Sequence, residues 1–216
     1  MDNRKIVSSL GGSFNPIHQN HIDIMVKTKE WLGLNTDFEV VSWILVVTID
    51  KYLISKFWNS NEKILTGEHR MELCQLASAR HDWLMVYPVP CVSSYMAGMI
   101  HRNNDNTLHV GIVMGGDKYD QMGRAHWRHN AMHGVHVDII IGRDDVTTRM
   151  DTDIHIVTDN VGDLSFTSVR KVLDRIGSDE SEEAYEKLSI IMSMADYVVK
   201  HREDLYITQE DIEGRY

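Results

Sequence analysis

The sequence predicts an α/β protein with a parallel β-sheet, helices on both faces of the sheet, and a helical C-terminal extension. Short apolar segments alternate with amphipathic segments from residue 5 to residue 157. Two apolar segments, residues 38–48 and 108–114, are nearly continuous, as is typical of strands that are covered on both faces. Strands that alternate with helices pair in parallel through right-handed crossovers, so the pattern favours a single sheet.

Each element follows from a local pattern. The first expected strand, KIVSSL at residues 5–10, is ended by two glycines. Further apolar runs predict strands at residues 38–48, 84–87, 108–114, 135–141 and 154–157. Apolar residues at helical spacing predict helices at residues 18–31, 62–79, 93–101, 165–176 and 181–201.

Charge divides the chain into two parts. Of 216 residues, 43% are hydrophobic and 25% charged, as in an ordinary soluble globular protein. Residues 177–216 hold 11 acidic and 4 basic side chains, and so carry −7 of the formal net charge of −10. We therefore expect one domain at residues 1–176, with residues 177–216 as an acidic helical extension packed on it. Whether the extension is a solvated face, a subunit contact or a lid is left open.

Composition also narrows the compartment and the partners. We expect a cytoplasmic protein without a membrane partner, because no signal-peptide pattern is present and the apolar run at residues 40–49 is too short to cross a bilayer. Cys74 and Cys91 have neither metal nor redox spacing. An acidic chain without a basic stripe does not favour nucleic acid as a partner. Formation of a homo-oligomer is left open.

Unusual residues follow several of the expected strands. GGSFNPIHQNH, from Gly11 to His21, follows the first strand, and Gly115-Gly116-Asp117 follows the fourth. The last expected αβ element opens with SFTSVR, at residues 165–170. In an open parallel sheet, ligands bind beyond the carboxyl ends of the strands. We therefore expect these three segments to meet at one site.

The residue types in these segments suit a polyphosphate. Glycines such as Gly12 let the backbone approach phosphate oxygens and present N–H groups to them. Thr167 and Ser168 at a helix start add hydroxyl donors to the positive end of the helix dipole, and Arg170 offers a forked pair of donors. His18 and His21, three residues apart, project from one face of a first helical turn and are suited to stabilising charge on phosphorus.

The same segments resemble a known family. GGSFNPIHQNH resembles the first motif of the nicotinamide/nicotinic acid mononucleotide adenylyltransferases, GSFNPxHxGH, and LSFTSVR is similar to their second motif, ISSTxIR. Between them, MGGDKYDQM, GEHRMELCQLA with Arg70 and HVDIIIGR with Arg143 look like further family segments. The resemblance runs from about Ile6 to Leu173. It implies a Rossmann-like nucleotidyltransferase domain of the HxxH superfamily.

The resemblance implies adenylyl transfer in NAD biosynthesis. The phosphate of nicotinamide mononucleotide (NMN) or nicotinic acid mononucleotide (NaMN) would attack the α-phosphorus of ATP, giving NAD or deamido-NAD plus pyrophosphate, with Mg²⁺ on the phosphates. His18, His21 and Arg170 would be catalytic. The resemblance assigns nucleotide binding to Gly12, Ser13, Phe14, Asp117, Thr167, Ser168, Lys56 and Trp127.

Two of these assignments have competitors. Lys56 corresponds to a lysine near the mononucleotide phosphate, and Lys51 competes for that role. Trp127 corresponds to a tryptophan that could stack on the pyridine ring, and Trp83 and Tyr95 are alternative aromatic candidates.

Departures from the motifs keep other functions open. Asn20 stands where the family has glycine, Phe166 replaces a serine, and Met96 replaces a threonine found in some bacterial relatives. One alternative is another HxxH nucleotidyltransferase, of the pantetheine-phosphate or cytidylyl type, although the FNPIH segment favours the pyridine branch. The other alternative is a nucleotide-binding sensor that kept the fold and lost turnover.

A histidine-rich segment raises a metal hypothesis. His126, His129, His133 and His136 lie within RAHWRHNAMHGVH. Catalytic zinc needs three ligands with set geometry, and here no carboxylate or cysteine is suitably interleaved. The sequence therefore favours solvated histidines, and it predicts no protein-held metal site.

Overall fold

A six-stranded sheet forms the centre of the computed structural model, which describes residues 4–57, 62–103, 108–121, 137–142, 154–157 and 192–214. The strands are β1 (Arg4–Gly12), β2 (Phe38–Val47), β3 (Leu84–Val86), β4 (His109–Gly115), β5 (Val137–Gly142) and β6 (Ile154–Val157). The helices are α1 (Gln19–Asn35), α2 (Asp50–Phe57), α3 (Gly67–Ser78), α4 (Ser93–Asn103), α5 (Gly116–Gln121), α9 (Met192–Lys200) and α10 (Gln209–Gly214).

The topology of the sheet is that of a Rossmann-like fold. The strand order is β3-β2-β1-β4-β5-β6, and all five neighbouring pairs are parallel. From β1 the chain builds outward through β2 to β3, and then returns to place β4 on the other side of β1. This reversal makes the carboxyl ends of β1 and β4 the switch point, where ligands bind in such sheets. The predicted fold class is confirmed.

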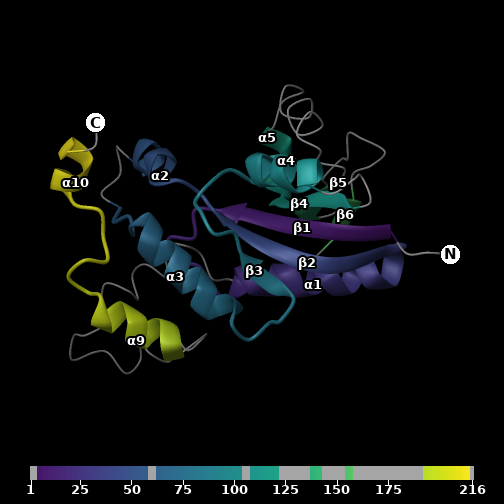
Figure 1. The fold of residues 1–216 in the computed structure, drawn as a ribbon, viewed down its shortest axis with the longest axis horizontal. Helices are drawn as coiled ribbons and strands as arrows, with labels where there is room; N and C mark the ends of the chain where they lie inside the picture. Colours follow the sequence, from purple (N-terminus) through teal and green to yellow (C-terminus); the bar gives the residue numbers. More distant parts are fainter. Residues whose placement is uncertain are drawn as a thin grey trace.

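Helices cover both faces of the sheet. In Figure 1, α1 and α3 lie below the sheet and α4 and α5 above it; α1 packs on β2, α3 on β2 and β3, α4 on β1 and β4, and α5 on β4 and β5. The central strand β1 contributes to the core on both faces of the sheet because its side chains point alternately to one face and the other. Ile6 and Leu10 join the core on one face, and Val7 joins the core around Met96 on the other. Each fully buried residue of this kind stabilises the fold by ~1.5–3 kcal/mol.

Three short helices are missing from the sequence prediction. They are α2, α5 and α10, of 8, 6 and 6 residues. The sequence showed Gly115-Gly116-Asp117 only as residues that follow a strand, whereas α5 begins directly at Gly116. A helix of one or two turns shows too few apolar repeats for its period to stand out, which explains all three omissions.

The described part of the C-terminal extension packs on α3 and the segment that precedes it. Met194 and Val198 of α9 are buried, as their helical spacing predicted. Beyond α9, Leu65 forms an isolated antiparallel bridge with Tyr206, and Ile207 N–H donates to Ile64 O at 2.8 Å. Figure 1 shows α9 and α10 at the end of the molecule farthest from the N-terminus. The expected domain boundary at residues 176 and 177 lies outside the described residues.

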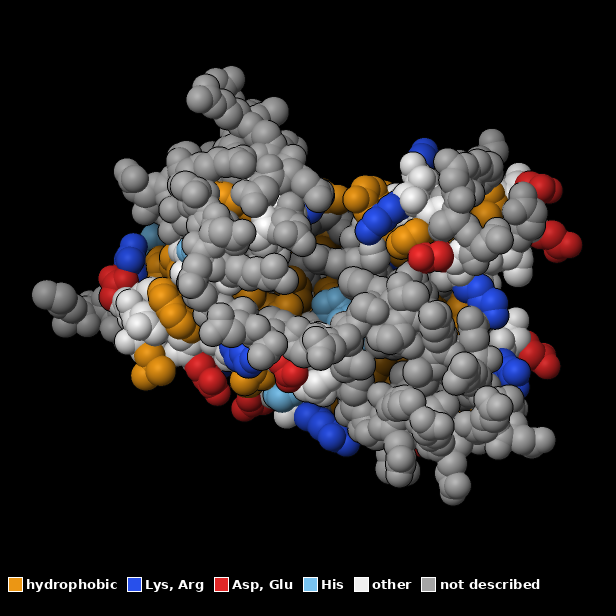
Figure 2. All heavy atoms as spheres, turned by 180° about the vertical axis from the view of Figure 1, so that it is seen from behind, with side chains coloured by type: hydrophobic (Ala, Val, Ile, Leu, Met, Phe, Trp, Pro, Cys, Tyr) orange, Lys and Arg blue, Asp and Glu red, His pale blue; other side chains and the backbone are white. Residues whose placement is uncertain are grey.

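The described surface mixes both signs of charge. On the face drawn in Figure 2, Lys and Arg side chains are interspersed with Asp and Glu around the edge of the molecule. Within the described segments, no helix combines the length and apolar character needed to cross a bilayer.

Candidate active site

The two glycines that end β1 are closely packed. A Cβ atom on Gly11 would lie 2.2 Å from Ser93 Oγ at the start of α4, and one on Gly12 would lie 2.9 Å from the Phe14 ring. Phe14 itself is fully buried and has a φ of 42°, in the left-handed region that non-glycine residues rarely adopt. Such a conformation costs ~1–2 kcal/mol and persists only where the surroundings impose it. The packing around Phe14 therefore holds the turn in a strained conformation.

Asn15 holds this turn to the segment that leads into α3. Its Nδ2 donates to Lys63 O at 3.0 Å, and its Oδ1 accepts from Leu65 N–H at 2.8 Å. The side chain is buried, with 1% exposed. Asn15 therefore has a structural role in the motif, because both ends of its amide bind protein backbone.

Arg70 ties the turn to the end of β2 and the start of α2. Its guanidinium is fully buried, and it donates to Ser13 O and Thr48 O at 2.7 Å each, to Leu65 O at 3.3 Å and to Asp50 Oδ1 at 2.6 Å. Burial lowers the pKa of Arg70 while Asp50 raises it, and the group stays charged. The sequence showed Arg70 only as part of a family segment. Its four acceptors come from three separate segments of the chain, at Ser13, Thr48–Asp50 and Leu65, and left no sequence signal for this role.

His18 and His21 lie together at the start of α1. His18 is the N-cap residue, and its backbone N–H donates to His21 Nδ1 at 3.1 Å. The two ring centroids are 3.9 Å apart, and the Phe14 ring meets the His21 ring edge-on at 5.0 Å. Because Nδ1 of His21 accepts a hydrogen bond, we assign the proton of the neutral ring to Nε2. His21 is therefore oriented as a donor through Nε2.

Burial keeps both imidazoles uncharged at neutral pH. It lowers the pKa of His18, which is only 5% exposed, to about 4. It lowers the pKa of His21 to about 3, to which the neighbouring His18 also contributes. An anion placed beside the rings would favour their charged forms and raise both pKa values. The pair is thus a neutral donor site whose charge depends on what binds next to it.

The segment from Gly11 to His21, called the histidine turn below, lies at the same edge of the sheet as Asp117. β1 and β4 are adjacent and parallel, so the turn after Gly12 and the helix that begins at Gly116 both leave from the switch point. Asp117 is the second residue of α5. Two of the three predicted segments are therefore brought together as expected.

Lys56 lies near the end of α2, exposed, with Nζ 5.2 Å from the centroid of the neighbouring Phe57 ring. Lys51, in the first turn of the same helix, is also exposed. The structure does not decide between them.

Trp83 and Tyr95, the two alternative aromatic candidates for stacking on a pyridine ring, lie at different places in the fold. Trp83 precedes β3, beside the middle of β2, and its ring meets the Trp43 ring edge-on at 6.4 Å. It lies away from the carboxyl edge, so its candidacy for stacking on a pyridine ring is wrong, and its role is packing. Tyr95 is half exposed in the first turn of α4. It lies near Ser93, which contacts Gly11, and therefore near the histidine turn. Tyr95 remains a candidate.

The remaining predicted residues lie outside the described residues. These are Trp127, Thr167, Ser168 and Arg170, together with Arg143, Phe166 and the four histidines at positions 126, 129, 133 and 136.

Comparison with known proteins identifies the family. A model of the cytidylyltransferase-like family matches residues 9–197, which include the histidine turn and the strands β2 to β6 that follow it. The chain belongs to the cytidylyltransferase-like family. This membership confirms the resemblance on which the motif assignment rests, over most of the chain.

Curated relatives of this cytidylyltransferase-like protein are mononucleotide adenylyltransferases. Nicotinamide/nicotinic acid mononucleotide adenylyltransferase 2 of Xenopus tropicalis is 31% identical over 80 residues, and that of Danio rerio is 34% identical over 80 residues. In both cases the match covers 37% of this chain and 24% of the relative, so it spans about a quarter of the relative's length. A probable nicotinate-nucleotide adenylyltransferase of Enterococcus faecalis is 25% identical over 139 residues, covering 61% of this chain and 58% of the relative.

A solved structure shares the fold over nearly the whole chain. It is the nicotinic acid mononucleotide adenylyltransferase of Plasmodium falciparum, complexed with NaAD. The TM-score is 0.60 at 15% identity, over 93% of this chain and 97% of the other. The match supports the Rossmann-like fold of the family member described here.

Proposed function

We propose that this protein is a nucleotidyltransferase that transfers AMP from ATP to NMN or NaMN, giving NAD or deamido-NAD and pyrophosphate. The observation that carries the proposal is the His18–His21 pair at the switch point, with rings 3.9 Å apart and His21 oriented as a donor through Nε2. The family match and the named activities of the curated relatives support the same reaction class.

The reaction needs donors where negative charge develops. An oxygen of the mononucleotide phosphate forms a bond to the α-phosphorus of ATP, and the bond from that phosphorus to the bridging oxygen of pyrophosphate breaks. Preorganised N–H donors in a site shielded from water stabilise such a transition state. His21 Nε2–H and the adjacent imidazole of His18 would supply them. They need only hold charge, because the acceptor phosphate is already an anion and no proton must be removed from it.

Mg²⁺ fits this proposal as part of the substrate Mg·ATP. The described motif supplies imidazole nitrogens and backbone N–H groups, whereas Mg²⁺ prefers oxygen ligands and is commonly held by the substrate's own phosphates. Thr167, Ser168 and Arg170 would hold the outer phosphates of ATP, and Asp117 its ribose. Lys56 and Trp127 would bind the mononucleotide. A cytoplasmic location and the absence of nucleic acid or membrane partners stay predictions.

A second candidate function is nucleotidyl transfer with another nucleotide or acceptor. The cytidylyltransferase-like description of the matching family favours it. It shares the histidine pair and the reaction class, and differs in whether CTP replaces ATP and in whether the acceptor carries a pyridine base.

One assay separates these functions. The protein is incubated with Mg·ATP and, in parallel, NMN, NaMN or phosphopantetheine, and again with Mg·CTP; pyrophosphate and the nucleotide products are measured. We expect pyrophosphate and dinucleotide in equal amounts with ATP and at least one pyridine mononucleotide. Product only with phosphopantetheine or only with CTP would contradict the proposal in favour of the second candidate. ATP binding without any product would indicate a non-catalytic nucleotide-binding protein.

A further inference from the structure

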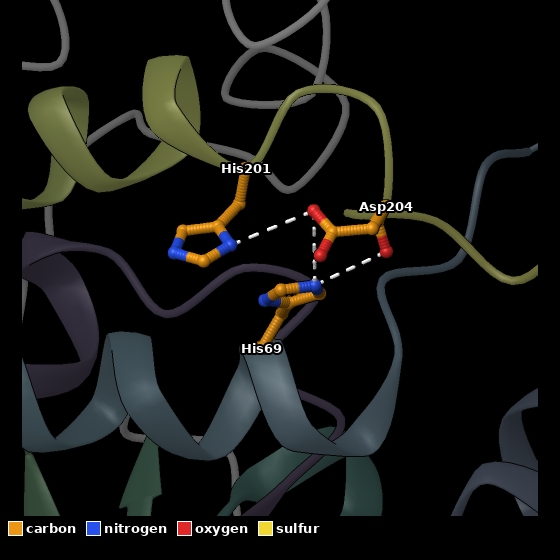
Figure 3. Close-up of side chains that lie close together, drawn as sticks. All are labelled: His69, His201 and Asp204. Carbon is orange, nitrogen blue, oxygen red and sulfur yellow. Dashed lines mark hydrogen bonds and ion pairs between the residues drawn. The ribbon is translucent and has the colours of Figure 1, made fainter.

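A second histidine cluster lies where the C-terminal segment meets α3, away from the histidine turn. It consists of His69 on α3, His201 just after α9, and Asp204 three residues further along (Figure 3). One ligand atom from each residue can be chosen so that all three lie within 4.8 Å of one another. Within the segments the structure describes, this is the one group of three potential metal ligands.

Two of the three distances between ligand atoms are close to those of a metal site, and the third lies within 4.8 Å. His201 Nδ1 lies 3.5 Å from Asp204 Oδ1, and His69 Nε2 lies 3.7 Å from the same oxygen. Figure 3 shows both rings turned toward the carboxylate. Ligands at 2.0–2.2 Å from a tetrahedral zinc ion are about 3.3 Å apart, so a small contraction would bring these atoms to coordination distance.

Tyr197 fixes the His69 ring in the orientation that a metal ligand needs. Its hydroxyl lies 2.7 Å from His69 Nδ1, which directs Nε2 toward Asp204. Metal-binding histidines commonly donate their second N–H to an oxygen in this way, which sets the tautomer. The Tyr197 ring also stacks on the His201 ring, with centroids 4.4 Å apart. One aromatic side chain thus orients both imidazoles.

Burial differs across the cluster in a way that suits an ion held at the surface. The side chain of His69 is 8% exposed, that of His201 26% and that of Asp204 68%. The ion would be anchored on the protein side by His69, and its remaining coordination position would face water. Two imidazoles and one carboxylate favour zinc or a similar transition metal over Mg²⁺ or Ca²⁺, which prefer all-oxygen sites.

We propose that His69, His201 and Asp204 bind one divalent transition metal ion of the zinc class. The ion joins the C-terminal segment to α3. It thereby supports Arg70, the residue after His69, which holds the backbone of Ser13 in the histidine turn. The sequence gives no local sign of this cluster, because His69 lies more than 130 residues from its two partners, and the prediction of no protein-held metal did not consider it.

The contacts have a simpler explanation without a metal, which the test must separate. His69 Nε2 also lies 3.1 Å from the backbone oxygen of Asp204, so a hydrogen bond from Nε2–H would hold the same arrangement. If this hydrogen bond alone explains the arrangement, removing the carboxylate of Asp204 should not change how much metal the protein binds.

The test compares Asp204→Asn with Glu203→Gln, which removes an acid from the exposed neighbouring position in the same turn. The full chain is stripped with a chelator, dialysed and titrated with Co²⁺ alone, and its visible absorption and bound metal are measured. We expect wild type and Glu203→Gln to bind one equivalent more than Asp204→Asn. His201→Gln should lose the same equivalent. The comparison between variants removes any contribution from other histidine-rich segments.

Thermal unfolding provides a second measurement. Zn²⁺ should raise the Tm of wild type and Glu203→Gln, and should leave the Tm of Asp204→Asn unchanged; the same concentration of Mg²⁺ should raise none of them. Equal Co²⁺ stoichiometry in wild type and Asp204→Asn would overturn the proposal. So would a Glu203→Gln variant that loses metal as fully as Asp204→Asn.

Discussion

Two histidine clusters in this protein differ in burial and in charge. His18 is buried and His21 is half-buried, and burial lowers the pKa values of their rings to about 4 and about 3. The cluster of His69, His201 and Asp204 includes an exposed carboxylate between its rings. Two neutral N–H donors suit an anion, whereas a carboxylate with two imidazoles suits a cation. The same residue type is thus placed for opposite ligands.

Arg70 connects the two clusters. It follows His69 on α3, and its guanidinium binds the backbone of the turn that leads to His18. Its buried charge is balanced by Asp50, and three further N–H groups donate to the backbone carbonyls of Ser13, Thr48 and Leu65. These four hydrogen bonds within the protein give Arg70 the role of positioning the turn.

The largest effect should come from breaking this connection. Arg70→Met removes a buried charge from Asp50 and removes the donors that bind Ser13, Thr48 and Leu65. Losing one partner of a buried pair costs ~3–5 kcal/mol, so the free energy of unfolding in urea should fall by about that amount. The matched control is Arg4→Met, which breaks the exposed Arg4–Asp37 pair and should leave the free energy of unfolding nearly unchanged, because solvent screens exposed ion pairs. Equal losses in the two variants would contradict the positioning role.

Within the first cluster, His21→Ala should lower turnover without unfolding the protein. Removing one preorganised donor to developing negative charge typically reduces kcat by ~10²–10³-fold. Alanine is a strong helix former, so α1 should persist in far-UV circular dichroism. The rate of pyrophosphate release measures the effect, and His81→Ala, which lies outside both clusters, is the control. A wild-type rate in His21→Ala would show that the motif is wrongly assigned.

The low pKa values predict acid sensitivity. A ring that protonates at about pH 4 in the folded state and near 6.5 in the unfolded state stabilises the fold above pH 6.5, and this contribution is lost as pH falls toward 4. His18→Gln should therefore reduce the loss of unfolding free energy between pH 7 and pH 5 by about 2 kcal/mol. Urea unfolding at both pH values tests this, with His81→Gln controlling for the loss of one imidazole. An unchanged pH dependence in His18→Gln would argue against a buried, neutral ring.

The smallest effect should come from restoring the family's glycine. Asn20 is 7% exposed and lies in the first turn of α1, so we expect its side chain to pack against protein and not to crowd a nucleotide. Asn20→Gly should lower stability by roughly 0.5 kcal/mol and leave the KM for ATP within about twofold of wild type. A marked fall in that KM would instead show that Asn20 obstructs the nucleotide.

The sequence alone predicted the sheet, its parallel pairing and the place of the histidine turn. Each rests on local order, since an apolar run, two glycines and histidines three apart are all visible within a few residues. Asp117 could be placed near the turn because the carboxyl ends of parallel strands share one edge. Short helices such as α2 and α5 were missed because one or two turns carry too little periodicity.

Only the tertiary structure decided what individual polar residues bind. Asn15 proved to hold the segment before α3, Trp83 to pack on Trp43, and Arg70 to bind groups from three separate segments of the chain. Hydrogen bonds and burial are properties of groups brought together by folding. No fixed spacing along the sequence therefore predicts them. GGSFNPIHQNH thus marked the candidate site by itself, whereas burial, which lowers the pKa values of His18 and His21, and the meeting of His69 with His201 and Asp204 arise only in the folded chain.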